Sequence, residues 1–429
     1  MFENILNQNI VLQLKKDILD SKLAPAVLFS GTEYAGKGTS ALELARVLSC
    51  EAQGKWNCTC GACQKHRLLA HSDLLLLGRR HFFEEISAAA NYLLREPQKE
   101  GARILFSRAV QKLLARFAPV LWEDDPKIKK VTPLIAGLEE DLDEIGRLEN
   151  EKLEKCCGGI VKNSAKLESE GLGEQIPVAL IRRASYWSRL APLGKHKCVI
   201  IENAERMQEG AKNSLLKILE EPPASLTVVL TSSRAGSLLP TIVSRLRVYQ
   251  FAKRGTGEER EVIRRIFHDE YEGGIAPYLE SFLPVNDRVL YPLSAFFAAS
   301  TAACAVRELR QRGRPIPGVL VDLGKFAAPV AENAGLGRPA QNTGEIIEAA
   351  VKTCGGFQIP HVGSLFFRNI RALVSAWLRN GKMSVEKSAY AQLWSRELEK
   401  SAVRFETYNI NPVLTLEGLC ESLAKGMAV

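Results

Sequence analysis

The hydrophobic pattern of this chain is marked by short, strongly apolar runs. Four of them have the length of a β-strand: residues 26–30, 74–77, 198–201 and 226–230. Runs of this kind are typical of strands that are covered on both faces, as in a parallel sheet. Between the last two runs, apolar residues recur at helical spacing, and a pair of prolines ends that helix. The order strand, helix, strand predicts two parallel strands joined by a crossover, and therefore an α/β core.

Polar residues follow two of these strands where the strands end. Glu202 and Asn203 come directly after the run at 198–201, and Thr231 follows the run at 226–230. The carboxyl ends of parallel strands meet at one edge of the sheet, where open α/β sheets bind ligands. We therefore expect these three side chains to lie side by side at that edge.

A glycine-rich loop follows the first strand. It contains Gly31, Gly36 and Lys37 at the spacing of a Walker A phosphate-binding loop, and a helical pattern begins directly after it. The sequence thus predicts a nucleotide-binding loop. However, Gly38 stands where a Ser or Thr hydroxyl should hold Mg²⁺. Thr39 comes one residue later, about 100° further around the helix, so we do not expect it to replace that hydroxyl.

The strand at 198–201 shows a second departure from an ATP-hydrolysing site. In P-loop enzymes, carboxylates in this region bind the metal and position water. Here the strand is followed by Glu202, which can still reach a metal, and by Asn203, whose amide cannot act as a general base. Together with Gly38, Asn203 predicts a P-loop fold that has lost its hydrolytic chemistry.

Three further motifs lie downstream of the P-loop. They are the run NSLLKILEEPP at residues 213–223, the TSS strand end at 231–233 and the pair Ser244-Arg245. With the P-loop, and in this order, they resemble the AAA+ module of bacterial clamp-loader subunits. More narrowly, they are similar to the delta-prime and gamma/tau subunits of DNA polymerase III.

The resemblance implies a domain organisation. We expect an α/β AAA+ module with a parallel sheet and flanking helices over residues 1–250, a small helical lid at 251–310 and an α-helical collar domain at 311–429. Within the first domain, the resemblance implies an inserted zinc module at 50–66, and a helical insertion occupies residues from about 81 to 175.

Four cysteines and one histidine are crowded into the implied zinc module. In the subunits that the chain resembles, a lone cysteine is followed by three cysteines at CxxCxxC spacing. Cys50, Cys60 and Cys63 match that pattern. His66 takes the fourth place, with Cys58 as the alternative ligand. Both residue types are normal zinc ligands, so the resemblance implies one structural Zn²⁺ in a closed, four-ligand site.

The segment after the strand at 74–77 is unusually long. Apolar residues at helical spacing within 104–121 and a second, acidic helix around 138–148 predict a helical hairpin. Its mixed charges indicate a solvated surface or a partner contact. Because long surface insertions cost little loop entropy, we expect this hairpin to be dispensable for folding of the core.

Composition and charge restrict the class of protein. No uninterrupted apolar run reaches the roughly 20 residues that span a bilayer, and the amphipathic N-terminus carries acidic residues, so we expect a cytoplasmic protein without a membrane partner. In that compartment, the ten cysteines are expected to stay reduced or to bind metal. The net charge of +8 permits contact with a phosphate backbone without demanding it.

The resemblance implies a delta-prime-type clamp-loader subunit that does not hydrolyse ATP. Its partners would be the gamma/tau and delta subunits, the sliding clamp and primed DNA. ATP would be bound weakly here, or only by neighbouring subunits. Arg245 has no evident internal carboxylate partner in the sequence, and the resemblance implies that it reaches the γ-phosphate of a neighbour's ATP in trans.

Two other hypotheses are less well supported. An ATP-hydrolysing gamma/tau-type motor subunit would be favoured by a Thr after the P-loop lysine and by an Asp-Glu pair after the strand at 198–201. An unrelated zinc-containing nucleic-acid-binding protein would carry basic clusters beside the cysteines and aromatic residues that stack on bases. Residues 65–67, with Trp56 nearby, form the only such cluster.

Overall fold

The computed structural model describes residues 1–123, 125–355, 360–381, 383–406 and 411–427. The chain folds into two compact units, Met1–Phe282 and Leu283–Val429. The domain boundaries expected at residues 250 and 310 fall inside these units. The helix pair that follows the sheet packs within the first unit, and the helix that ends at Gln311 belongs to the second.

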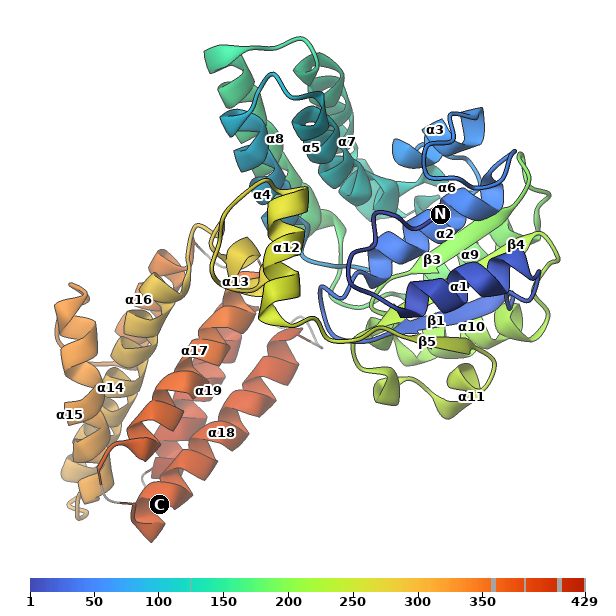
Figure 1. The fold of residues 1–429 in the computed structure, drawn as a ribbon. Helices are drawn as coiled ribbons and strands as arrows, with labels where there is room; N and C mark the ends of the chain where they lie inside the picture. The colour runs from blue at the N-terminus through green and yellow to red at the C-terminus, as the bar shows by residue number, and fades with distance from the viewer. Residues whose placement is uncertain (124, 356–359, 382, 407–410, 428–429) are drawn as a thin grey trace. The chain divides into compact units, whose positions relative to one another are not determined.

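The first unit is built on five parallel strands in the order β2-β3-β4-β1-β5 (Figure 1). The strands are β1 (Ala26–Ser30), β2 (Leu74–Leu77), β3 (Lys197–Ile201), β4 (Leu226–Ser232) and β5 (Arg247–Gln250). β3 and β4 are adjacent, as predicted, and Ile201 pairs with Leu230. The predicted α/β fold with a parallel sheet is therefore confirmed, and the carboxyl ends of β3, β4 and β1 share one edge.

Helices cover both faces of the sheet because successive strand residues point to opposite sides. Val27 and Phe29 belong to a buried cluster with α1 (Ile10–Leu19) and α2 (Lys37–Ser49). Leu28 instead belongs to a second cluster, which includes residues of α9 (Val178–Arg189) and α10 (Glu209–Glu220). Each strand is thus buried on both sides, which explains its continuous apolar run.

The insertion is larger than the predicted hairpin. Its elements are α4 (Phe82–Arg95), α5 (Glu100–Leu114), η1 (Ala115–Phe117), α6 (Pro119–Trp122), α7 (Pro126–Ile145) and α8 (Asn150–Gly171). Two hairpins, α4–α5 and α7–α8, form a bundle of four helices (Figure 1). Apolar residues of the bundle, including Phe82 and Phe106, share one continuous core with Leu77 and Ile201 of the sheet. The insertion is therefore part of the same hydrophobic core as the sheet.

Two helices after the sheet pack against α4. They are α12 (Thr256–Ile266) and α13 (Ile275–Glu280), and their apolar residues cluster around Ala88. Arg95 forms an ion pair with Asp269 at 3.1 Å, and Tyr92 stacks on His268. This helix pair, which lies within the segment expected to form the lid (251–310), is thus attached to α4.

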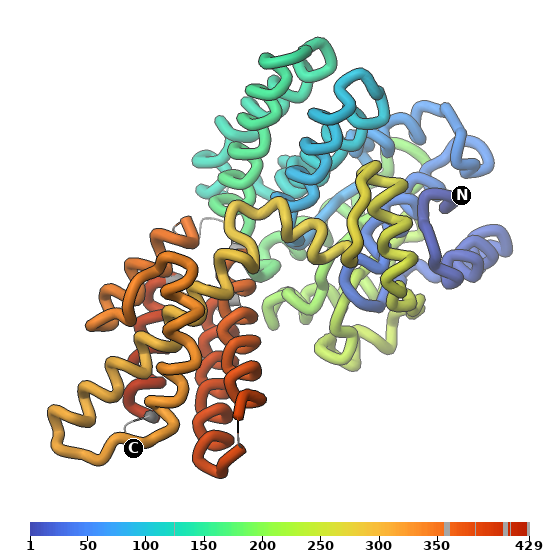
Figure 2. The backbone as a smooth tube through the Cα atoms, turned by 60° about the vertical axis from the view of Figure 1, so that its left-hand side comes forward, coloured from blue at the N-terminus to red at the C-terminus, as the bar shows by residue number. Residues whose placement is uncertain are grey.

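The second unit consists of helices that run alongside one another (Figure 2). They are α14 (Asp287–Gln311), α15 (Gly318–Asn333), α16 (Thr343–Thr353), α17 (Pro360–Arg379), α18 (Val385–Glu406) and α19 (Pro412–Met427). Within the described residues, α14 alone has the length and hydropathy to cross a membrane, but 67% of its apolar window is buried inside the structure. α14 is thus a core helix of this unit, where Phe297 packs edge-on against Phe366 and Trp394.

Candidate functional site

The predicted P-loop connects β1 to α2. Gly36, at the N-terminus of α2, has a φ of 94°, in the left-handed region that favours glycine. The Lys37 side chain is buried, and its Nζ donates to the carbonyl oxygens of Gly31 at 2.7 Å and Thr32 at 2.5 Å. Burial lowers the pKa of Lys37. The loop thus lies between a strand and a helix N-terminus, where a phosphate-binding loop is expected, and its lysine is held on the loop's own carbonyl groups.

The polar residues at the strand ends come together as predicted. The amide nitrogen of Asn203 donates to Oγ1 of Thr231 at 3.2 Å. The side-chain Nδ2 of Asn203 donates to the carbonyl oxygen of Arg79 at 2.7 Å, and Asn203 itself has a positive φ of 51°. Asn203 therefore ties the end of β3 to the segment that leads into α4, and its side chain has a structural role.

Gly38 and Glu202 are in direct contact. A Cβ atom at position 38 would lie closer than 3.0 Å to Oε1 of Glu202, a separation that real Cβ atoms essentially never show. A Ser or Thr at this position would therefore need Glu202 to move. Thr39 is exposed and does not take the place of the missing hydroxyl. The residues at this edge do not fit the magnesium ion that P-loop enzymes hold between a hydroxyl and a carboxylate.

Glu202 has a cationic partner that the sequence analysis did not identify. Oε2 of Glu202 forms an ion pair with Arg116 of η1, and the two side chains are only 8% and 3% exposed. Burial by itself would raise the pKa of Glu202, but the neighbouring cations, Arg116 foremost, outweigh burial and hold that pKa below its ordinary value. Glu202 is thus ionised and neutralised inside the protein.

Arg116 belongs to a row of basic residues on one side of the insertion. Arg108, Lys112 and Arg116 recur every four residues, a spacing that places them on one helical face. Arg108 donates to the carbonyl oxygen of His66 at 3.2 Å, and Lys112 pairs with Glu85. The mixed charges of this segment were expected to mark a solvated surface or a partner contact, whereas this row contacts groups within the same unit.

Arg254, in the segment that follows β5, also contacts the P-loop. Its guanidinium donates to the carbonyl oxygen of Tyr34 in the loop and, at 2.8 Å, to that of Leu6 in the N-terminal segment. The same group would lie 3.2 Å from a Cβ at Gly36. Because Arg254 is buried, these contacts tie the N-terminal segment and the segment after β5 to the loop.

The four cysteines of the expected zinc module gather around one point. The Sγ atoms of Cys50, Cys58, Cys60 and Cys63 all lie within 4.8 Å of one another. Cys50 Sγ is 3.6 Å from that of Cys58 and 3.9 Å from that of Cys60. A tetrahedral site with Zn–S bonds of about 2.3 Å needs sulfur atoms roughly 3.8 Å apart, so this geometry fits zinc.

His66, the expected fourth ligand, lies outside this cysteine group. It is buried in α3 (Gly61–Arg67) and stacks on His71 with ring centroids 4.2 Å apart. Burial and nearby cations lower its pKa to about 3, so the ring is neutral. Among the described residues, neither of its ring nitrogens has a hydrogen-bond partner. The geometry therefore favours Cys58, the alternative ligand, over His66.

Arg245 follows the short helix α11 (Pro240–Val243). Its guanidinium is about one-third exposed and pairs with Glu220, at the end of α10. This carboxylate partner is not evident from the sequence, because Glu220 and Arg245 are 25 residues apart. The pair leaves Arg245 accessible at the surface of the first unit.

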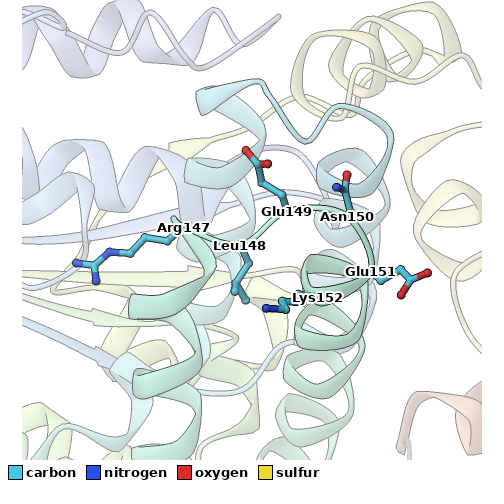
Figure 3. Close-up of a pocket in the computed structure, with 6 residues that line it drawn as sticks. All are labelled: Arg147, Leu148, Glu149, Asn150, Glu151 and Lys152. Carbon is cyan, nitrogen blue, oxygen red and sulfur yellow. The ribbon is translucent and has the colours of Figure 1, made fainter.

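A shallow pocket is present at the turn between α7 and α8 (Figure 3). It is lined by residues 147–152, and in the close-up Arg147 and Glu151 point to opposite sides of the turn. The pocket is remote in sequence from the P-loop and from the cysteine group at 50–63, and it overlaps the end of the acidic helix predicted around 138–148.

Curated relatives of this chain are DNA polymerase III subunits. The chain is 33% identical over 170 residues to DNA polymerase III subunit delta′ of Pseudomonas aeruginosa, a match that covers 39% of this chain and 48% of the relative. It is 42% identical over 57 residues to the subunit of the same name from Haemophilus influenzae, covering 13% and 17% of the two chains. The chain thus spans about half the length, or less, of the curated relatives it matches.

A solved structure and a family model also match. The structure is a DNA polymerase III gamma-subunit-related protein from Thermotoga maritima, with 16% identity, a TM-score of 0.37 and coverage of 97% of this chain and 99% of the other. The family model described as "DNA polymerase III, delta subunit" matches residues 6–118 and 144–255, which is just over half of the chain. The chain therefore belongs to this DNA polymerase III delta-subunit family, which confirms the clamp-loader resemblance of its motifs.

Proposed function

We propose that this chain is a delta-prime-type subunit of the DNA polymerase III clamp loader, an arm that helps to place the sliding clamp on primed DNA without hydrolysing ATP itself. Family membership and two curated relatives named delta′ support the assignment to this complex. The observation that carries the non-hydrolysing role is the contact between Glu202 and Gly38. A metal-binding hydroxyl at position 38 would need Glu202 to move, and Asn203 supplies no base.

In this proposal, the gamma/tau subunits hold and hydrolyse ATP, and the delta subunit completes the loader. Arg245 would act on the γ-phosphate held by a neighbouring subunit. An arginine supplied in trans stabilises charge in the transferring phosphoryl group and accelerates hydrolysis by roughly 10³-fold or more in other systems. The exposed position of Arg245 is compatible with this role, because an exposed ion pair costs little to break.

The four cysteines would hold one structural Zn²⁺. A closed four-sulfur site leaves no position for a substrate, so the zinc would be structural. It would stabilise the loop between α2 and α3. Arg46 donates to Sγ of Cys63 at 2.9 Å, and the amides of Ala52 and Gly54 donate to Sγ of Cys50. These hydrogen bonds fix the positions of the two sulfur atoms within the cysteine group.

The experiment is co-expression of this chain with the gamma/tau and delta subunits of the same source, followed by purification through a tag on delta. We expect a stable cytoplasmic complex that contains this chain, whereas the chain alone hydrolyses no ATP above background. Appreciable ATP turnover by the isolated chain would support the alternative, a gamma/tau-type motor subunit. Absence of this chain from the complex would contradict both assignments.

A further inference from the structure

The contact between Glu202 and Gly38 concerns the place where P-loop enzymes bind their magnesium ion. In those enzymes, the metal lies between the hydroxyl that follows the P-loop lysine and a carboxylate at the end of a neighbouring strand. In this chain, the carboxylate of Glu202 packs directly on Gly38, so the two positions enclose no space between them. The carboxylate that would bind the metal thus occupies the space that the missing hydroxyl would need.

A cation nevertheless neutralises this carboxylate. Arg116 pairs with Oε2 of Glu202, while Oε1 faces Gly38. Arg116 comes from η1 of the insertion, 86 residues away in the sequence. Its position is fixed by packing, because its guanidinium lies over the ring of Phe82, 5.5 Å from the ring centroid.

A second arginine strengthens the cationic environment. The guanidinium of Arg80 lies over the same Phe82 ring at 5.3 Å and pairs with Glu85 of α4. Arg80 also approaches Gly38. Its Nη1 atom would lie 3.9 Å from a Cβ at that position, and atoms of Glu202 would lie closer. Lys112 of α5 pairs with the other oxygen of Glu85. Arg80, just before the insertion, and Lys112 and Arg116 within it therefore surround Glu202 with positive charge.

We propose that Arg116 takes the place of the divalent cation at this P-loop, so that the helical insertion closes the magnesium subsite with a permanent internal ion pair. This inference rests on the proposed function in that it concerns the same P-loop. It adds a cause for the loss of the magnesium subsite, and this cause lies outside the P-loop and the end of β3. The subsite is closed by a group that the insertion delivers, and Mg²⁺ contributes nothing to nucleotide binding at this loop.

The proposal has an energetic consequence that can be measured without nucleotide. Removing one partner of a buried ion pair leaves an uncompensated charge and is strongly destabilising, whereas replacing both partners by neutral groups is often neutral. Arg116 and Glu202 should therefore be strongly coupled in stability.

The first test is a calorimetric titration of the full-length wild-type chain with ATP, once in excess MgCl₂ and once in EDTA. We expect affinities that agree within about twofold, or no detectable binding in either condition, because a Mg²⁺ ion has no subsite. ATP binding at least tenfold tighter with magnesium would overturn the proposal.

The second test is a cycle of Arg116→Gln, Glu202→Gln and the double variant, followed by thermal unfolding. Each single change should lower the Tm by roughly 5–15 °C, and the double variant should regain at least half of that loss. The control is Arg265→Gln, which breaks an exposed pair with Glu261 and should change the Tm by less than about 2 °C. Single variants as stable as the control would overturn the proposal. A single variant that does not fold, beside a double variant that does, would support it.

These tests separate the two proposals. If magnesium strengthens ATP binding but the chain still assembles with the gamma/tau and delta subunits, the closed subsite is wrong and the clamp-loader assignment stands. If the subsite is closed but no assembly forms, the clamp-loader assignment fails and the ion pair remains as found.

Discussion

Arg245 donates a hydrogen bond to Oε1 of Glu220 at 2.9 Å and a second one to the carbonyl oxygen of Thr241 at 2.8 Å. The two charged side chains are 36% and 49% exposed. An ion pair this exposed contributes about 1 kcal/mol or less to stability. The pair thus orients the guanidinium at the surface without binding it firmly, and a stronger anion from a partner can displace Glu220.

We predict that Arg245→Ala leaves the folding and metal content of the chain unchanged but lowers the DNA- and clamp-stimulated ATPase of the assembled loader. The ATPase rate should fall by about the share that one ATP site contributes, or by more. The reason is that the ATP at the neighbouring site loses the arginine that stabilises its transferring phosphoryl group. The measurement is steady-state ATP hydrolysis of loaders reconstituted with wild-type or variant chain.

Two further variants sharpen this test. Arg245→Lys should restore activity only in part, because an ammonium lacks the planar fork of a guanidinium. Glu220→Gln should keep most of the activity, since it removes only the surface partner. A loader with Arg245→Ala that hydrolyses ATP and loads clamps like wild type would rule out the role in trans.

The zinc site gives a second prediction. Protein purified without added zinc should contain close to one equivalent of the metal, measured by mass spectrometry. Cys58→Ser should reduce the bound metal and lower the Tm, because it removes one of four converging sulfur atoms.

His66→Ala is the matched comparison for that variant. It should retain its zinc, since His66 lies outside the cysteine group, although loss of a buried ring will lower the Tm by some degrees. Loss of zinc from the His66 variant together with full zinc in the Cys58 variant would restore the original ligand assignment. A metal-free wild-type protein whose thiols titrate freely would contradict zinc binding altogether.

A third prediction concerns ATP hydrolysis. Gly38→Thr should not create ATPase activity in the isolated chain, because Asn203 offers no base and the new side chain collides with Glu202. For the same steric reason, the variant should be less stable than wild type, whereas Thr39→Ala at the neighbouring exposed position should have a stability within about 0.5 kcal/mol of wild type. Hydrolysis by Gly38→Thr, followed as phosphate release, would show that the site had lost only its hydroxyl.

The fourth prediction reverses an expectation from the sequence. Deleting residues 81–175 and joining the ends with a Gly/Ser bridge should leave insoluble or largely unfolded protein, because Leu77 and Ile201 of the sheet lose the apolar partners that bury them. Replacing only the turn at 147–151 should be tolerated. Soluble yield and circular dichroism melting compare the two. A well-folded deletion variant with an unchanged Tm would show that the insertion is independent of the core.

Local patterns predicted the elements that local sequence determines. Continuous apolar runs identified the strands, and the glycine spacing identified the P-loop, because both signals lie within a few consecutive residues. The parallel pairing of β3 and β4 followed from the short helix between them. The cysteine cluster was also visible, since its members lie within 14 consecutive residues.

Partnerships between distant residues were not visible. Arg116 and Glu202 are 86 residues apart, and nothing near either one indicates the other. The charged insertion was expected to form a solvated surface or a partner contact because its charges are mixed, but composition does not show which face of α5 is buried. Spacing alone also did not decide between Cys58 and His66, because that choice depends on which atom the turn before α3 brings to the other sulfur atoms.

Clamp loading in a reconstituted system tests the central claim most directly. Loaders assembled from the gamma/tau and delta subunits, with or without this chain, would be given ATP, sliding clamp and a primed circular DNA, and clamps on DNA would be counted after gel filtration. We predict that loading depends on this chain and that its own P-loop is not needed, so that Lys37→Ala supports loading like wild type. Loading that proceeds equally well without the chain, or that requires Lys37, would contradict a non-hydrolysing clamp-loader subunit.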